Sequence, residues 1–128
     1  MTTVLVGTDS VHTTAAACDY LGPRLDSDDT VYLCSIPDSQ VSERDAGDAA
    51  NVARTRLVDP AVEILDFTTG AEADTVTTAL LAVADEHDVD ELVVGTRRGD
   101  PETAGESPGS TVRQLLAETE RPVVVVPV

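Results

Sequence analysis

The sequence predicts a three-layer α/β domain with an open, parallel, five-stranded sheet. Three observations support this. Five short apolar runs are spaced along 128 residues, stretches with helical periodicity separate them, and the first run, at 3–7, is continuously apolar rather than alternating. Continuous apolar strands are typical of a sheet covered on both faces, and alternating strands and helices give right-handed crossovers between parallel strands. The length fits one domain, which we take as residues 1–128.

The predicted strands are TVLVG at 3–7, TVYLCSI at 30–36, AVEILDF at 61–67, LVVG at 92–95 and PVVVVPV at 122–128. Residues 39–45 are polar and are expected to be mobile. The helices between the strands are predicted from apolar residues at helical spacing. Their expected buried faces are Val11, Ala15, Cys18 and Leu21; then Ala46, Ala49 or Ala50, Ala53 and Leu57; then Val76, Leu80, Val83 and His87; and finally Val112, Leu115, Leu116 and Thr119.

With strand order 3-2-1-4-5, the first and fourth strands flank the point where strand order reverses. Ligands of open α/β sheets bind beyond the carboxyl ends of the strands at this switch point. The fourth strand leads into a polar loop with several glycines, and Ser110 then begins a helical pattern. Glycines allow close backbone approach and a helix start presents unpaired N–H groups, so the arrangement suits an anionic ligand.

The strongly negative net charge argues against two classes of binding partner. The chain has 8 basic and 24 acidic residues, a formal charge of -16, and every basic residue is Arg. Nucleic acids and anionic membranes need a basic footprint, so neither is an expected partner. The acidity is of the haloarchaeal type and suits a halophilic protein with a solvated surface in a salt-rich cytoplasm. With no signal or lipidation motif and no long apolar stretch, a soluble, cytoplasmic protein is expected.

The order of elements and three motifs resemble the universal stress protein family over the whole chain. The motifs are the VLVGTDS start, the glycine loop before the last helix and the terminal PVVVVPV. The nucleotide-binding branch of that family has Gly, two residues, Gly, nine residues, then Gly-Ser or Gly-Thr. Here Gly99, nine residues, Gly109 and Ser110 match the second half, whereas three residues separate Gly95 from Gly99. A one-residue insertion is the simplest explanation, and the helix from Gly109 to Pro122 has the family's length.

The resemblance implies an adenine nucleotide alpha hydrolase-like (Rossmann-like) fold that binds ATP with Mg, or a related adenine nucleotide. The residues carried over to this site are Thr8, Asp9, Ile36, Gly95, Arg98, Gly99, Gly109, Ser110 and Thr111. By position, Asp9 would contact the ribose, with Thr8 beside it, and the backbone of Ile36 would meet the adenine. The glycines, Ser110 and Thr111 would hold the phosphates.

Each of these residues also has a simpler interpretation. Asp9 with Ser10 is an ordinary helix cap, Ile36 is a core residue, and Gly109 with Ser110 is a turn and cap. Arg97 and Arg98 can pair with phosphate or with neighbouring acids. Asp100, Glu102 and Glu106 in the same loop oppose a triphosphate.

Two further expectations concern function. The implied role is a nucleotide-dependent stress-response interaction protein, and the alternative is a dimeric stress-response scaffold without nucleotide. The Val-rich last strand would form a sheet edge, so a homodimer through Val123–Val126 is expected. Any ATP hydrolysis would be slow, because no general base or pair of metal-binding carboxylates is evident; a third alternative is an enzyme acting on another small ligand.

Single residues of chemical interest are few. Cys18 and Cys34 lie in apolar patterns without a C-x-x-C pair and are interpreted as buried small residues. His12 and His87 lack metal-ligand spacing and are interpreted as a surface residue and a helix-face residue. No catalytic residue and no metal site are predicted.

Overall fold

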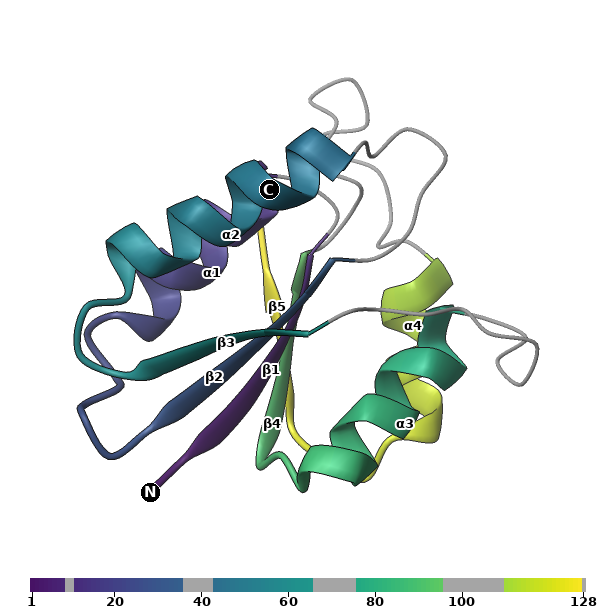
Figure 1. Ribbon diagram of the computed structural model, residues 1–128. Helices are drawn as coiled ribbons and strands as arrows, with labels where there is room; N and C mark the ends of the chain where they lie inside the picture. The colour runs from purple at the N-terminus through teal and green to yellow at the C-terminus, as the bar shows by residue number, and fades with distance from the viewer. Residues whose placement is uncertain (9–10, 36–42, 66–75, 96–109, 128) are drawn as a thin grey trace.

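The computed structural model describes residues 1–8, 11–35, 43–65, 76–95 and 110–127 of the chain (Figure 1). Strands and helices alternate along it, as predicted. In chain order the elements are β1 (Thr3–Thr8), α1 (Val11–Leu21), β2 (Thr30–Ser35), α2 (Glu43–Arg56), β3 (Ala61–Leu65), α3 (Val76–His87), β4 (Glu91–Gly95), α4 (Ser110–Glu118) and β5 (Val123–Val126).

The sheet has the predicted topology. Its five strands lie in the order β3-β2-β1-β4-β5, and the four neighbouring pairs are all parallel. β1 pairs with β2 on one side and with β4 on the other, so the chain changes direction across the sheet between β1 and β4. β5 lies at an edge of the sheet, as expected, beyond β4.

Helices cover both faces of the sheet. Figure 1 shows α1 and α2 on one face and α3 and α4 on the other. Val4 and Val6 of β1 belong to the apolar cluster on the α1 and α2 face, whereas Leu5 belongs to the cluster on the α3 and α4 face. Because side chains alternate along a strand, a strand covered on both faces contributes to both clusters, and this explains the continuous apolar run of β1.

Some predicted helix faces are wrong in detail. Leu116 of α4 was expected inside, but it is 57% exposed, while Val112 and Leu115 are buried. In α1, Ala15 and Val11 are only partly buried. The buried residues there are Thr13, Thr14, Ala17, Cys18 and Leu21. α1 packs against both the sheet and α2, so its buried face is wider than a single apolar stripe.

Two element boundaries also differ from prediction. α2 begins at Glu43, before the predicted helical stripe that starts at Ala46 and within the segment 39–45 that was expected to be mobile. α4 ends at Glu118 rather than extending to Pro122. Pro122 instead precedes β5, and its carbonyl oxygen accepts a hydrogen bond from the Leu92 N–H (3.0 Å). A proline has no N–H to donate, so this position at the start of a strand suits it.

The helix ends follow from local chemistry. Gly22, directly after α1, donates its N–H to the Cys18 carbonyl oxygen at 2.8 Å; a Cβ at Gly22 would come within 3.1 Å of that oxygen. α3 ends where Asp88 adopts a positive φ of 51°, and the Val89 N–H then reaches back to the Ala84 carbonyl oxygen (3.1 Å). This is the left-handed C-terminal cap that aspartate tolerates better than most residues.

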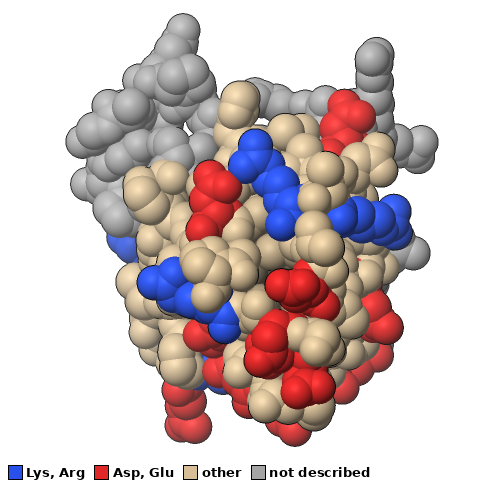
Figure 2. Space-filling view, turned by 90° about the vertical axis from the view of Figure 1, so that its left-hand side faces the viewer, with Lys and Arg blue, Asp and Glu red and all other residues tan. Residues whose placement is uncertain are grey.

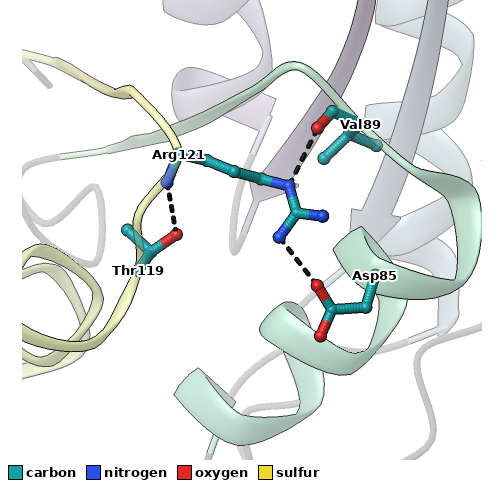
Figure 3. A network of polar contacts seen from close by, with 4 residues as sticks. All are labelled: Asp85, Val89, Thr119 and Arg121. Atoms are coloured by element: carbon teal, nitrogen blue, oxygen red, sulfur yellow. Dashed lines mark hydrogen bonds and ion pairs between the residues drawn. The ribbon is translucent and has the colours of Figure 1, made fainter.

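Arg121 connects the turns at the amino end of the sheet (Figure 3). Its Nε donates to the Val89 carbonyl oxygen at 2.8 Å, and a terminal guanidinium nitrogen pairs with Asp85 at 2.8 Å. The backbone N–H of Arg121 donates to Thr119 Oγ1 (3.1 Å). The residue therefore joins the α4–β5 turn to the end of α3 and to the α3–β4 connection.

A buried carboxylate fixes the first strand at the same end of the sheet. Asp29, 7% exposed, accepts hydrogen bonds from the backbone N–H groups of Thr2 (2.6 Å) and Asp26 (2.8 Å). These bonds, that from Asp26 first, hold the pKa of the Asp29 carboxyl below its ordinary value. Its own carbonyl oxygen accepts from the Ala61 N–H at 3.0 Å, so one residue ties the starts of β1, β2 and β3 together.

Candidate functional site at the carboxyl edge of the sheet

The candidate site lies at the switch point, between β1 and β4, where the order in which the chain adds strands to the sheet reverses. Because the strands are parallel, β1 and β4 both end at the carboxyl edge, at Thr8 and Gly95. α4 connects β4 to the parallel strand β5, so its first residue, Ser110, also lies toward this edge (Figure 1). Two strand ends and a helix N-terminus thus lie at the same edge of the sheet, which is where anionic ligands bind in open α/β sheets.

The predicted site residues divide into described and undescribed ones. Thr8 and Gly95 are the last residues of β1 and β4, and Ser110 and Thr111 begin α4. The other predicted residues lie outside the described part of the chain: Asp9, Ile36, Arg98, Gly99 and Gly109. The structure therefore brings four of the predicted positions to one edge of the sheet, and the roles of all nine stay predictions.

Thr8 is turned toward α1. It continues the row of Val4 and Val6 on the α1 and α2 face of the sheet, and it is 1% exposed. Its hydroxyl oxygen lies 2.8 Å from that of Thr14 in α1, within hydrogen-bonding distance. Thr14 is itself 0% exposed and was not predicted as part of the site. The sequence feature that could have indicated this contact is the pair Thr13 and Thr14, which are polar residues in the first turns of an otherwise apolar helix face.

A second polar contact joins the two helices on the opposite face. Thr77, in the first turn of α3, donates its hydroxyl to the Gln114 side-chain oxygen at 2.9 Å, and Thr77 is 1% exposed. Gln114 lies just past the first turn of α4, so this bond secures the amino-terminal half of α4 against α3. The two residues are 37 positions apart, and sequence spacing gave no indication of their contact.

The charges of the described residues are unevenly distributed. In Figure 2 most of the visible acidic side chains gather toward the end of the molecule away from the grey segments. The turns at the amino end of the sheet carry the exposed acids Asp26, Asp28, Asp59, Asp88 and Asp90. By contrast, the described carboxyl-edge positions Thr8, Gly95, Ser110 and Thr111 are uncharged. The carboxylates of those turns are thus at the far end of the sheet from an anion at the carboxyl edge, and their repulsion is correspondingly weak.

The histidines and cysteines give no sign of metal or redox chemistry. His12 is exposed, and the His87 ring packs on Tyr32 with ring centroids 4.5 Å apart. Among the described residues, no group of three or more His, Cys, Asp and Glu side chains could hold a metal ion. Cys18 and Cys34 are buried free thiols, which confirms their interpretation as core residues, and burial raises the pKa of each to about 11.

Comparison with known proteins identifies the fold. No family model and no curated protein matches the sequence. The structure is similar to that of a universal stress protein from Archaeoglobus fulgidus, with 17% identity, 98% of both chains covered and a TM-score of 0.62. It is also similar to a universal stress protein in complex with cAMP (20% identity, 98% and 96% covered, TM-score 0.64) and to a protein from Mycobacterium tuberculosis H37Rv (22% identity, 98% and 94% covered, TM-score 0.54).

These similarities show that the chain has the fold of the universal stress proteins, the adenine nucleotide alpha hydrolase-like α/β fold. They cover nearly the whole chain on both sides, so the likeness is not limited to a common βαβ unit. At these identities the comparison defines the fold, and the function has to be argued from the site. A search of the described residues for a helix long and apolar enough to cross a membrane found none.

Proposed function

We propose that this chain is a universal stress protein-like module that binds ATP or a related adenine nucleotide at the switch point between β1 and β4. The observation that carries the proposal is the convergence of the ends of β1 and β4 with the N-terminus of α4 at one edge of the sheet. A protein with the same fold was crystallised with cAMP, which supports an adenine nucleotide as the ligand. The role we propose for the present chain is a nucleotide-dependent interaction with a partner in a stress response.

In this proposal the phosphates bind to backbone N–H groups rather than to cationic side chains. The first N–H groups of a helix have no intrahelical partners, so those at Ser110 and Thr111 can donate to phosphate oxygens. Gly95, Gly99 and Gly109 would let the backbone approach closely, with Arg98 as a phosphate partner. Asp9 would accept from the ribose hydroxyls, and the backbone of Ile36 would pair with the adenine edge. Magnesium would arrive with the nucleotide, coordinated by its phosphates.

Calorimetric titration with ATP and magnesium in concentrated potassium chloride tests the proposal. We expect saturable binding with one nucleotide per chain. Substitution Gly109→Val should abolish it, because a branched side chain at the start of the phosphate-binding helix blocks backbone approach. Gly47→Val is the control, since a Cβ at this position meets nothing within 4 Å. No heat of binding with the wild-type protein would refute the proposal.

The second candidate function is a dimeric stress-response scaffold without nucleotide, and the edge position of β5 favours it. The strand consists of four valines, and Val123, Val124 and Val125 are only partly buried in the isolated chain. Its outer backbone groups are unpaired with any described strand, which makes the edge a template for pairing with a second copy. The three-residue spacing between Gly95 and Gly99 also favours this candidate over nucleotide binding.

Sedimentation velocity of a Val124→Asp variant tests the pairing of β5 edges. The added carboxylates would repel across the pair and lose apolar contact, so we expect a shift from dimer to monomer. Val58→Asp adds the same charge at a valine that is 81% exposed in the turn after α2, and it should leave the dimer intact. A wild-type protein that sediments as a monomer would contradict the homodimer.

A further inference from the structure

A buried pair of hydroxyl groups joins the carboxyl end of β1 to α1. Thr8 is the last residue of β1, and Thr14 is the fourth residue of α1. Their Oγ1 atoms are 2.8 Å apart, and the residues are 1% and 0% exposed. Residues 9 and 10 separate the two elements along the chain. The hydrogen bond therefore spans the short β1–α1 connection and begins one residue before Asp9.

Polar side chains are unusual at this place in the core. The preceding β1 residues on the same face are Val4 and Val6, and the next turns of α1 bury Ala17, Cys18 and Leu21. Valine has nearly the shape of threonine and would fill the same space. A buried hydrogen bond between hydroxyls adds little net stability, because both groups give up hydrogen bonds to water on folding. What the pair adds beyond the packing that valine would supply is a geometric constraint.

The hydrogen bond between Thr8 and Thr14 constrains how α1 is positioned relative to the end of β1. Small apolar side chains such as alanine allow a helix to shift along a sheet at little cost, whereas a hydroxyl pair is satisfied over a narrow range of distance and angle. At Thr14 this constraint acts on the first turns of α1, next to the end of β1. It limits the relative positions of the two elements at the edge where the nucleotide is proposed to bind.

We propose that Thr14 is a positioning residue for the nucleotide site. By holding the end of β1 at Thr8 and the first turns of α1 in one arrangement, it orders this side of the site before the ligand arrives. A site that is ordered in advance loses less conformational entropy on binding and binds more tightly. The inference rests on the proposed nucleotide-binding function, and it adds a residue of α1 that does not itself contact the ligand.

Three substitutions at Thr14 separate positioning from packing. Thr14→Val keeps the shape and removes the hydroxyl. Thr14→Ser and Thr14→Ala both remove the methyl group, but only serine keeps the hydroxyl. The affinity for ATP with magnesium is measured by calorimetry, and the free energy of unfolding by urea titration. We expect the valine and alanine variants to bind about tenfold more weakly, and the serine variant to bind like the wild type.

Thr119→Val is the control for loss of a hydroxyl far from the site. Its Oγ1 accepts from the Arg121 N–H at 3.1 Å at the amino end of the sheet, so the variant should keep its affinity for ATP. If Thr14→Val does not fold, the comparison of Thr14→Ser with Thr14→Ala decides the question, because both lose the methyl group and they differ only in the hydroxyl.

The outcomes distinguish this inference from the proposed function. Equal affinities for the serine and alanine variants, or a wild-type affinity for Thr14→Val, would overturn the role of Thr14. If Gly109→Val still abolishes binding in that case, the nucleotide site itself stands. A wild-type protein that binds no ATP would refute the site and this inference together.

Discussion

Arg121 is predicted to be the most stabilising of the described arginines. We consider Arg121→Met, which keeps most of the apolar stem and removes the guanidinium. The Nε bond to the Val89 carbonyl oxygen is 2.8 Å long, and the arginine side chain is only 25% exposed. A hydrogen bond between a charged donor and a partly buried acceptor contributes about 1.5 kcal/mol or more, and the pair with the 73% exposed Asp85 adds at most about 0.5 kcal/mol. The expected loss is therefore about 2 kcal/mol.

Urea unfolding in concentrated salt measures this loss, with Arg56→Met as the matched control. Arg56 pairs with Asp19 at 2.9 Å, but the two side chains are 51% and 70% exposed, and both substitutions change the net charge equally. The control should lose less than about 0.5 kcal/mol, because exposed ion pairs contribute little and salt screens them. Equal losses for the two variants would refute the reasoning, since it assigns the difference to the Val89 carbonyl and to burial.

Three further predictions concern stability and reactivity. The lowered pKa of Asp29 contributes stability that is present above the ordinary aspartate pKa and lost as the pH falls through the folded value, so Asp29→Asn should flatten the acid limb of a stability–pH curve; an unchanged limb would contradict this. Cys18 and Cys34, with raised pKa values, should react with a thiol reagent only in urea, and rapid labelling of the native protein would argue against their burial. With a net charge of -16, desalting should lower the melting temperature through carboxylate repulsion, and a rise would contradict that expectation.

The fold was predictable from sequence because strand burial leaves a simple signal. A strand such as β1 faces helices on both sides and is apolar at Val4, Leu5 and Val6, and short runs rich in apolar residues recur five times. Helix faces were predicted less well. Leu116 fits the apolar spacing of α4, but the sheet covers only a narrow stripe of that helix, and Val112 and Leu115 fill it. Periodicity gives the direction of a buried face, and its width depends on which neighbours pack against the helix.

The candidate site was predictable in position and not in its supporting contacts. The position of the switch point follows from the strand order. The strand order was predicted from the alternation of strands and helices and from the family resemblance. The contacts Thr8–Thr14 and Thr77–Gln114 depend on how helices dock on the sheet. A threonine in a helix has the same appearance in sequence whether its hydroxyl meets water or a buried partner, so only the three-dimensional structure distinguishes these cases.

Nucleotide binding at the switch point is tested most directly by a crystal structure of the protein grown with ATP and magnesium. We expect the nucleotide beyond the carboxyl ends of β1 and β4, with phosphate oxygens within hydrogen-bonding distance of the N–H groups of Ser110 and Thr111. Nucleotide density elsewhere on the molecule, or a crevice filled by the chain between β4 and α4 with no room for phosphate, would contradict it.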